Sequence, residues 1–353
     1  MSFLRRKPPR ASPDGAAGQR VAIEAFWSWW VTKGSAQTAL AIEGRDPERM
    51  VSALSERVDA IDSGLAWELG PGSDSSHVLV VTGEGNPDLR PLARRWRMAA
   101  PVADLTWSYS DVRLPAPDVQ DVVLRMGEVD LDAGAANADV RVVGAQIDVV
   151  VHHPRYPELP EDAQRTATFL LLDAVLGESD VETWIGQIGS SEVPALDPIP
   201  LVALRAVVED VRAQHTGPDG EPHWVMLNGT TPDGGAILAS TQVPLRASTA
   251  PHLDTYVPVV VPFADRTEQG LPGPGSLSAL RDLEDHLTLL LGDSGRIVAH
   301  QSHDGVRILH VYVDGTTPAA EQVRAGVVGW DQGAVKVDVQ LDPGWSSVRH
   351  LRP

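Results

Sequence analysis

Two stretches of the chain share one order of elements: an apolar strand, a glycine turn, a proline-started helix and a second strand. The first is VLVVTGEGNPDLRPLARRW followed by DLTWSYSDV, and the second is LHVYVDGTTPAAEQVRAGVV followed by AVKVDVQLD. This order is typical of a βαβ unit, whose helix packs on the sheet that its strands join. The pattern therefore predicts an α+β protein with helices on one face of mixed sheets.

Because the pattern occurs once in each half, we expect two ferredoxin-like α/β-sandwich domains. A chain of 353 residues is long enough to bury two cores. The first twenty residues are basic, lack the apolar stretch of a signal peptide and are expected to be disordered. The expected segments are the tail at 1–20, the N-terminal domain at 21–213, a linker at 214–223 and the C-terminal domain at 224–353.

Several helix ends can be predicted from single residues. The helix in VAIEAFWSWWVTKG is expected to end at Gly34, and the next to begin with Pro47. A further helix is expected to start at Asn86-Pro87, and Pro91, one turn into it, is expected to bend it. In the back half, Ser276 is expected to cap a leucine-striped helix that ends at Gly292.

The charge and the missing cysteines exclude several classes of protein. With 29 Lys and Arg against 48 Asp and Glu, the net charge is −19, which repels nucleic acid and favours a basic protein partner. The chain has no cysteine, which excludes disulfides and thiolate chemistry and favours a cytoplasmic location. No apolar run reaches the ~20 residues that span a bilayer, so no membrane association is expected.

The segment GRIVAHQSHDGVRILHVYVDG, residues 295–315, carries three histidines that suggest a metal site. Asp304-Gly305, however, predicts a tight hairpin in which His300 faces Leu309. Side chains alternate along a strand, so His300 and His310 then lie on opposite faces, and a metal needs its ligands to converge. A three-residue loop would change this parity; with the tight turn we expect a structural hairpin.

Other candidate sites are weaker. His152 and His153 are adjacent and point to opposite faces of a strand, and the pair Asp282 and His286 lies opposite the leucine stripe of its helix. GEGNPD could hold an anion but is explained more simply as a tight turn. None of the sequence motifs of nucleophilic or zinc hydrolases occurs, so no catalytic residue, metal or cofactor is assigned.

Ten tryptophans form an unusual share of the aromatic residues. Those at helical spacing are expected in the core. Trp29, Trp184 and Trp330 cannot be placed from the pattern, and together with Trp345 they are candidates for a structural role or an exposed interaction patch.

Residues 222–353 resemble the bacterial domain of unknown function 695. The matching pieces are QGLP at 269–272, LEDHL at 283–287, HDGVRILHVYVDG at 303–315, DPGW at 342–345 and Pro353. The chain departs from that family near its end, where Ser346, Ser347 and Arg352 stand in place of a usual aromatic and tyrosine. The front half is similar to segments of related uncharacterised proteins through WELGPG and LVVTGEGNPDLRPL.

That family is similar in turn to the family of regulator B of RNase E activity, small ferredoxin-like proteins that act by binding an enzyme. The resemblance implies an α+β fold and protein binding, and it supplies no catalytic residue. Within the matching pieces, strand alternation places Arg307 on the same face as Leu309 and Val311, where a buried guanidinium needs a carboxylate partner. Glu284, at the edge of the helix's apolar stripe, is the candidate partner.

Three functions fit these observations. The first is a cytoplasmic, non-enzymatic regulatory protein that binds a protein partner through an acidic surface. The second is a hydrolase-type enzyme whose site lies at the cleft between the domains. The third is an immunity-type protein that neutralises a basic partner, and the charge alone does not separate it from the first.

Overall fold

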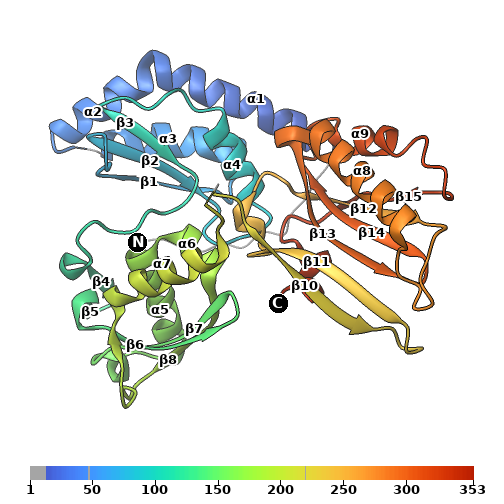
Figure 1. Ribbon diagram of the computed structural model, residues 1–353. Helices are drawn as coiled ribbons and strands as arrows, with labels where there is room; N and C mark the ends of the chain where they lie inside the picture. Colours follow the sequence, from blue (N-terminus) through green and yellow to red (C-terminus); the bar gives the residue numbers. More distant parts are fainter. Residues whose placement is uncertain (1–12, 47, 219) are drawn as a thin grey trace. The chain divides into compact units, whose positions relative to one another are not determined.

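The computed structural model describes residues 13–46, 48–218 and 220–353 (Figure 1). It divides into two compact units, and the boundary along the chain lies between Arg113 and Leu114. The expected N-terminal domain at 21–213 is therefore split, and the expected linker at 214–223 falls inside the second unit, between a helix and a strand. Pro47, Asp219 and residues 1–12 lie outside the described residues.

The first unit holds a three-stranded sheet in the order β1-β2-β3, covered by helices. β1 pairs antiparallel with β2, and β2 pairs parallel with β3 after the crossover through α4, so this sheet is mixed and contains the expected βαβ unit. Its core is aromatic, with Phe26, Trp30 and Trp96 buried. The elements are α1 (Pro13–Trp29), α2 (Ser35–Glu43), α3 (Glu48–Ile61), β1 (Ala66–Gly70), β2 (His77–Thr82), α4 (Arg90–Met98) and β3 (Trp107–Ser110).

Three expectations for this unit are wrong. Residues 13–20 belong to α1 and not to a disordered tail. Pro91 does not bend α4, because the helix begins only at Arg90 and proline is tolerated in a first turn. Gly34 does not end the first helix: the chain passes through a π-helical turn, Trp30–Gly34, directly into α2. A Cβ on Gly34 would lie 2.8 Å from the Trp29 ring, so this glycine makes room for the indole.

The second unit begins with a sheet in the order β8-β7-β6-β9 and a separate β4–β5 hairpin. β7 pairs antiparallel with β6 and parallel with β8, and Gly144 turns β6 into β7 as expected. Apolar side chains of the helices pack on one core with the sheet. The elements are β4 (Val123–Met126), β5 (Val129–Asp132), β6 (Asn137–Val143), β7 (Gln146–His152), α5 (Glu161–Leu176), α6 (Glu178–Trp184), β8 (Ile185–Ser191), β9 (Ile199–Pro200) and α7 (Leu204–His215).

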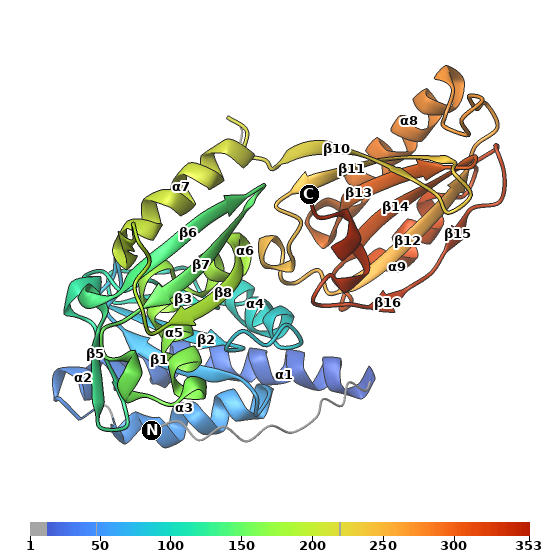
Figure 2. The ribbon, with the colours of Figure 1, turned by 90° about the horizontal axis from the view of Figure 1, so that it is seen from below.

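The C-terminal sheet runs in the order β10-β11-β13-β14-β12-β15, and β16 also pairs with β12 (Figure 2). Every pairing in it is antiparallel, so the expectation of a mixed sheet is wrong here. The two helical connections, β12–α8–β13 and β14–α9–β15, each skip one intervening strand, which keeps neighbours antiparallel. The elements are β10 (His223–Thr230), β11 (Ala236–Val243), β12 (Thr255–Pro262), α8 (Pro274–Leu291), β13 (Gly295–His303), β14 (Val306–Val313), α9 (Ala319–Gly326), β15 (Lys336–Val337) and β16 (Gln340–Leu341).

This sheet has a core on each face. Leucines of α8 and residues of α9 pack on one face against β12 and β14. The chain's last turn of 3-10 helix, Ser346–Leu351, packs on the other face with Trp345. α8 ends at Gly292 as expected, but it begins at Pro274, and Ser276 donates a hydrogen bond to Gln332 from within the first turn rather than capping it.

The β13–β14 hairpin has the expected two-residue turn. Asp304 and Gly305 both have positive φ, 46° and 79°, and His300 faces Leu309. The register shifts between Ile297 and Ala299, where β13 contains a β-bulge. The three histidines are therefore held in a hairpin with the predicted register.

In the part of the chain that the structure describes, no helix is long and apolar enough to cross a membrane.

Candidate functional site

The strongest polar cluster of the C-terminal sheet lies between α8 and the β13–β14 hairpin. The expected pair is present: Arg307 Nη1 lies 2.8 Å from Glu284 Oε1. Arg307 also donates from Nε to Ser302 Oγ at 2.9 Å, and Nδ1 of His300 lies 3.5 Å from Glu284 Oε2. The carboxylate of Glu284 is thus shared between a buried arginine and a partly exposed histidine.

The two neighbours fix the ionisation of Glu284. Burial alone raises the pKa of its carboxyl, but the contacts with His300 and Arg307 outweigh burial, and the pKa lies below its ordinary value. Glu284 is therefore an anion at neutral pH, and both its oxygens are engaged. Such a carboxylate is suited to positioning His300 rather than to accepting a proton itself.

His300 supports an exposed aromatic residue on the edge of the sheet. The rings of Trp224 and His300 are stacked, with centroids 6.3 Å apart and an interplanar angle of 28°. Trp224 is 47% exposed, and Met226, two residues along β10, is 68% exposed. Both side chains lie on the same face of β10. Met226 pairs with Ser240 of β11, and Ser240 pairs with His300 of β13, so this is the face of the sheet that His300 occupies.

β10 is the outermost strand of its sheet, and no other strand of the described residues pairs with its free edge (Figure 1). We define the β10 edge as strand His223–Thr230 with Trp224 and Met226. This strand was not predicted from the sequence. Its signal was the alternation in HWVMLNGT followed by a glycine turn and a second alternating run.

The β10 edge ends in a polar groove of about 640 Å³. Two pieces of the family resemblance meet there: the amide of Gly305 donates to the carbonyl of Gly270 at 2.9 Å, and a Cβ on Gly270 would lie 3.1 Å from Asp304 Cα. The groove contains the acidic side chains of Glu268 and Asp304 and the basic one of Arg266. Its lining includes Gly229, Thr230, Gly235, Thr267 and Gln269.

The opposite face of the sheet holds His310, the third histidine of the hairpin. His310 is 3% exposed, and its Nδ1 shares a hydrogen bond with the Tyr256 hydroxyl at 2.7 Å. Burial, followed by the nearby His350 and His300, lowers the pKa of His310 to about 4, so it is neutral at neutral pH. Burial raises the pKa of Tyr256 to about 12. His300 and His310 thus serve different faces, as expected.

The tryptophan candidates do not form a surface patch. Trp184 and Trp345 are buried, Trp345 stacking on Tyr312 and donating to the Leu253 carbonyl at 2.8 Å. Trp330 is half-buried and donates to the Pro262 carbonyl at 2.8 Å. Trp29 is half-buried beneath the guanidinium of Arg57. The exposed tryptophan is Trp224, which sequence analysis had not singled out.

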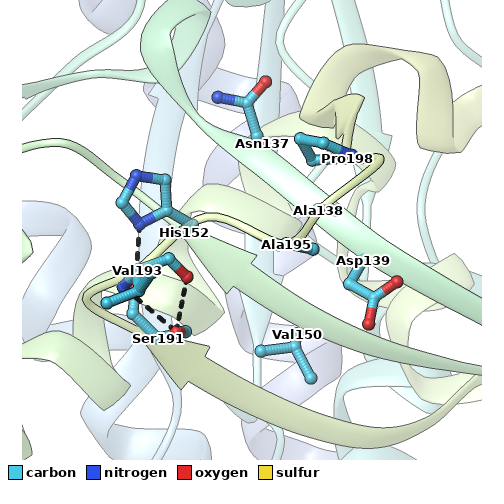
Figure 3. A pocket seen from close by; sticks show the side chains of 9 residues that line it. All are labelled: Asn137, Ala138, Asp139, Val150, His152, Ser191, Val193, Ala195 and Pro198. Carbon is cyan, nitrogen blue, oxygen red and sulfur yellow. Dashed lines mark hydrogen bonds between the residues drawn. The ribbon is translucent and has the colours of Figure 1, made fainter.

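The adjacent histidines of β7 also separate. His152 lines a pocket of about 220 Å³, where its Nδ1 lies 3.0 Å from the Ser191 carbonyl oxygen (Figure 3). His153 is buried on the other side, and its Nε2 lies 3.0 Å from the carbonyl oxygen of Asp132. Burial lowers the pKa of His153. Among the described residues, no group of three or more His, Asp or Glu side chains could hold a metal ion.

Comparison with known proteins finds a similarity in the C-terminal part of the chain. Residues 224–350 match the model of the Family of unknown function (DUF695), so the predicted resemblance is confirmed for this region. No curated protein and no solved structure matches the chain. The matched region includes the β10 edge, the groove, and the Arg307–Glu284–His300 cluster.

Proposed function

We propose that this is a cytoplasmic, non-enzymatic protein that binds a partner protein through the β10 edge. The observation that carries the proposal is the pair of exposed apolar side chains, Trp224 and Met226, on a long strand with a free edge. An open edge presents unpaired backbone N–H and C=O groups to which an extended peptide can add as a further strand. Aromatic residues and methionine are enriched in the centre of protein interfaces.

The occupant that fits this edge is an extended, basic segment of a partner protein. The chain carries a net charge of −19, and the groove at the end of β10 contains Glu268 and Asp304. A basic side chain near one end of the added strand would meet these carboxylates. Opposite charges speed association and select the orientation of the bound strand.

We further propose that β12–α8–β13–β14–α9–β15 is a ferredoxin-like sandwich extended at one edge by the β10–β11 hairpin. Support comes from the strand order β13-β14-β12-β15 and from the two connections that each skip one strand. The proposed distant similarity to the regulator B of RNase E activity family rests on the same arrangement. In this arrangement the added hairpin, rather than the sandwich itself, carries the binding edge.

The test is site-specific photocrosslinking in the native host, with the crosslinker at Met226 or, as a control, at Leu289, an 85% exposed leucine on α8. A partner captured only from Met226 is then purified and titrated against Trp224→Ala. We expect a loss of about 2 kcal/mol in binding free energy, roughly thirtyfold in Kd. Hydrogen exchange of the β10 amides should slow in the complex. Equal capture from both positions, or unchanged affinity of Trp224→Ala, would refute the proposal.

A further inference from the structure

We propose a second binding site, for a phosphate group, formed by Arg246, Arg349 and Arg352 on the face of the C-terminal sheet opposite α8. Arg349 and Arg352 are three residues apart at the last 3-10 turn, where the Arg352 amide donates to the Arg349 carbonyl at 3.3 Å. Nε of Arg352 donates to the Leu245 carbonyl at 3.0 Å, which places its guanidinium next to the backbone of Arg246, and both Arg246 and Arg352 are repelled by Arg349. Two distant segments therefore bring three cations together.

These cations lack the partners that the buried arginines of the chain have. Arg307 is paired with Glu284, and Arg90 with Asp111. Among the described residues, no carboxylate lies within the 4.0 Å ion-pair distance of the three guanidinium groups. In a chain with 48 acidic residues, three mutually close arginines without a carboxylate form an unusual surface.

The carboxylate that attracts Arg352, that of Asp342, is already engaged by other groups. Asp342 accepts hydrogen bonds from the Tyr312 hydroxyl and from Ser346 and Ser347, at distances between 2.7 and 2.9 Å. Burial, and then repulsion by Arg246 and Arg349, lowers the pKa of Arg352 to about 10 in spite of Asp342. Repulsion among the three arginines thus outweighs the attraction of Asp342 for Arg352.

A buried ring nitrogen without a hydrogen-bond partner lies next to the same turn. Nδ1 of His310 shares a hydrogen bond with the Tyr256 hydroxyl, and its Nε2 has no hydrogen-bond partner among the described residues. The ring of His310 meets that of His350 edge-on at 6.1 Å, and His350 follows Arg349 in the chain. The last turn therefore carries His350 next to Arg349 in the chain and brings its ring against the buried imidazole of His310.

A phosphate group matches this chemistry. Its dianion accepts paired hydrogen bonds from planar guanidinium groups and offsets their mutual repulsion. The site lies on the opposite face of the sheet from Trp224, so it is independent of the partner-binding proposal. The ligand class is a small molecule that carries one or more phosphate groups.

The test is calorimetric titration of the full chain with inorganic phosphate and with pyrophosphate at low ionic strength. We expect saturable binding, tighter for pyrophosphate, that weakens at least tenfold in the double variant Arg246→Ala and Arg349→Ala. Arg281→Ala is the matched control, because Arg281 is an exposed arginine on α8 without an ion pair among the described residues. No saturable heat with either probe, or equal weakening by Arg281→Ala, would overturn the proposal.

A melting experiment separates binding from a structural role. Without phosphate, Arg349→Ala should melt at the same temperature as the wild type or higher, because one repelling charge is removed. Added pyrophosphate should raise the Tm of the wild type and raise that of Arg349→Ala much less. A lower Tm without phosphate, combined with a full response to pyrophosphate, would show that Arg349 is only structural.

Discussion

Glu284 shows how one side chain can connect the core to the surface. It holds a nearly buried arginine at one oxygen and a histidine at the other, and that histidine supports the exposed Trp224. Breaking such a pair costs more than the hydrogen bond itself, because the remaining charge stays buried without a partner. The stability of the sheet and the shape of the β10 edge therefore depend on the same carboxylate.

Replacing Arg307 by alanine should lower the free energy of unfolding by about 3 kcal/mol, because Glu284 loses its closest cation. Urea denaturation of the wild type and the variant measures this change. Arg324→Ala is the control: Arg324 forms an exposed pair with Glu321, and its loss should cost less than about 0.5 kcal/mol. Equal midpoints for Arg307→Ala and wild type would show that the pair does not stabilise the fold.

His310 gives the protein a defined sensitivity to acid. Its pKa is about 4 in the folded chain and about 6.5 in an unfolded one, so the unfolded state binds a proton first. Stability is then full above pH 6.5 and is lost as the pH falls toward 4, by about 3 kcal/mol.

The slope of unfolding free energy against pH tests this effect. His310→Gln should flatten the slope between pH 6.5 and 4, whatever its stability at pH 7. His286→Gln, which changes an exposed histidine on α8, should keep the wild-type slope. A slope that survives in His310→Gln must come from other groups.

At the scale of elements, local sequence patterns predicted turns and helix ends correctly where burial and turn chemistry agree. The Asp304-Gly305 hairpin, the turn at Gly144 and the end of α8 at Gly292 all follow from residues that favour positive φ. Patterns failed where a tertiary contact sets the local conformation. Gly34 looks like a helix end, but the helix continues through it. A glycine stands there because a Cβ would overlap the Trp29 ring.

The candidate site was predicted in part. The Arg307–Glu284 pair could be inferred because strand alternation and the leucine stripe place both side chains between helix and sheet. The β10 edge could not, since only strand pairing shows that β10 is outermost. The βαβ pattern led us to expect parallel pairing in the C-terminal sheet. That pattern predicts two parallel strands joined by a helix, but it does not show whether a third, antiparallel strand lies between them in the sheet.

Two helical glycines of the first unit should respond oppositely to alanine. A Cβ added to Gly18, in α1, would meet no atom within 4 Å, so Gly18→Ala should stabilise by up to about 1 kcal/mol. Gly34→Ala should destabilise the unit, because the methyl group would meet the Trp29 ring. Thermal unfolding followed by tryptophan fluorescence compares the two, and stabilisation by both would contradict the proposed role of Gly34.

At the scale of the molecule, the two compact units have separate cores, and the tryptophans are divided unevenly between them. Six of the ten lie before residue 113, among them the buried Trp30 and Trp96. Tryptophan fluorescence therefore reports mainly on the first unit, whereas circular dichroism reports on all helices and strands. Units with separate cores need not unfold together.

We expect the fluorescence and circular dichroism transitions in guanidinium chloride not to coincide. Trp96→Ala should cost the first unit about 3 kcal/mol or more. It should move the fluorescence transition to lower denaturant and leave a later circular dichroism transition in place. A single coincident transition in both proteins would show that the units unfold as one.

The β-bulge in β13 has a consequence for how the hairpin can vary. Because one extra residue stands between Ile297 and Ala299, odd-numbered Ile297 and even-numbered His300 contribute to the same side of the strand. Deleting Val298 would leave Ile297, Ala299 and His300 in regular alternation, so Ile297 and His300 would both stay on the side of the strand that faces α8. Ile297 would keep its place in the helix-side core and Glu284 its imidazole neighbour, and the cost would be the loss of the buried Val298 side chain on the opposite face, so this is the point at which the strand can shorten by one residue.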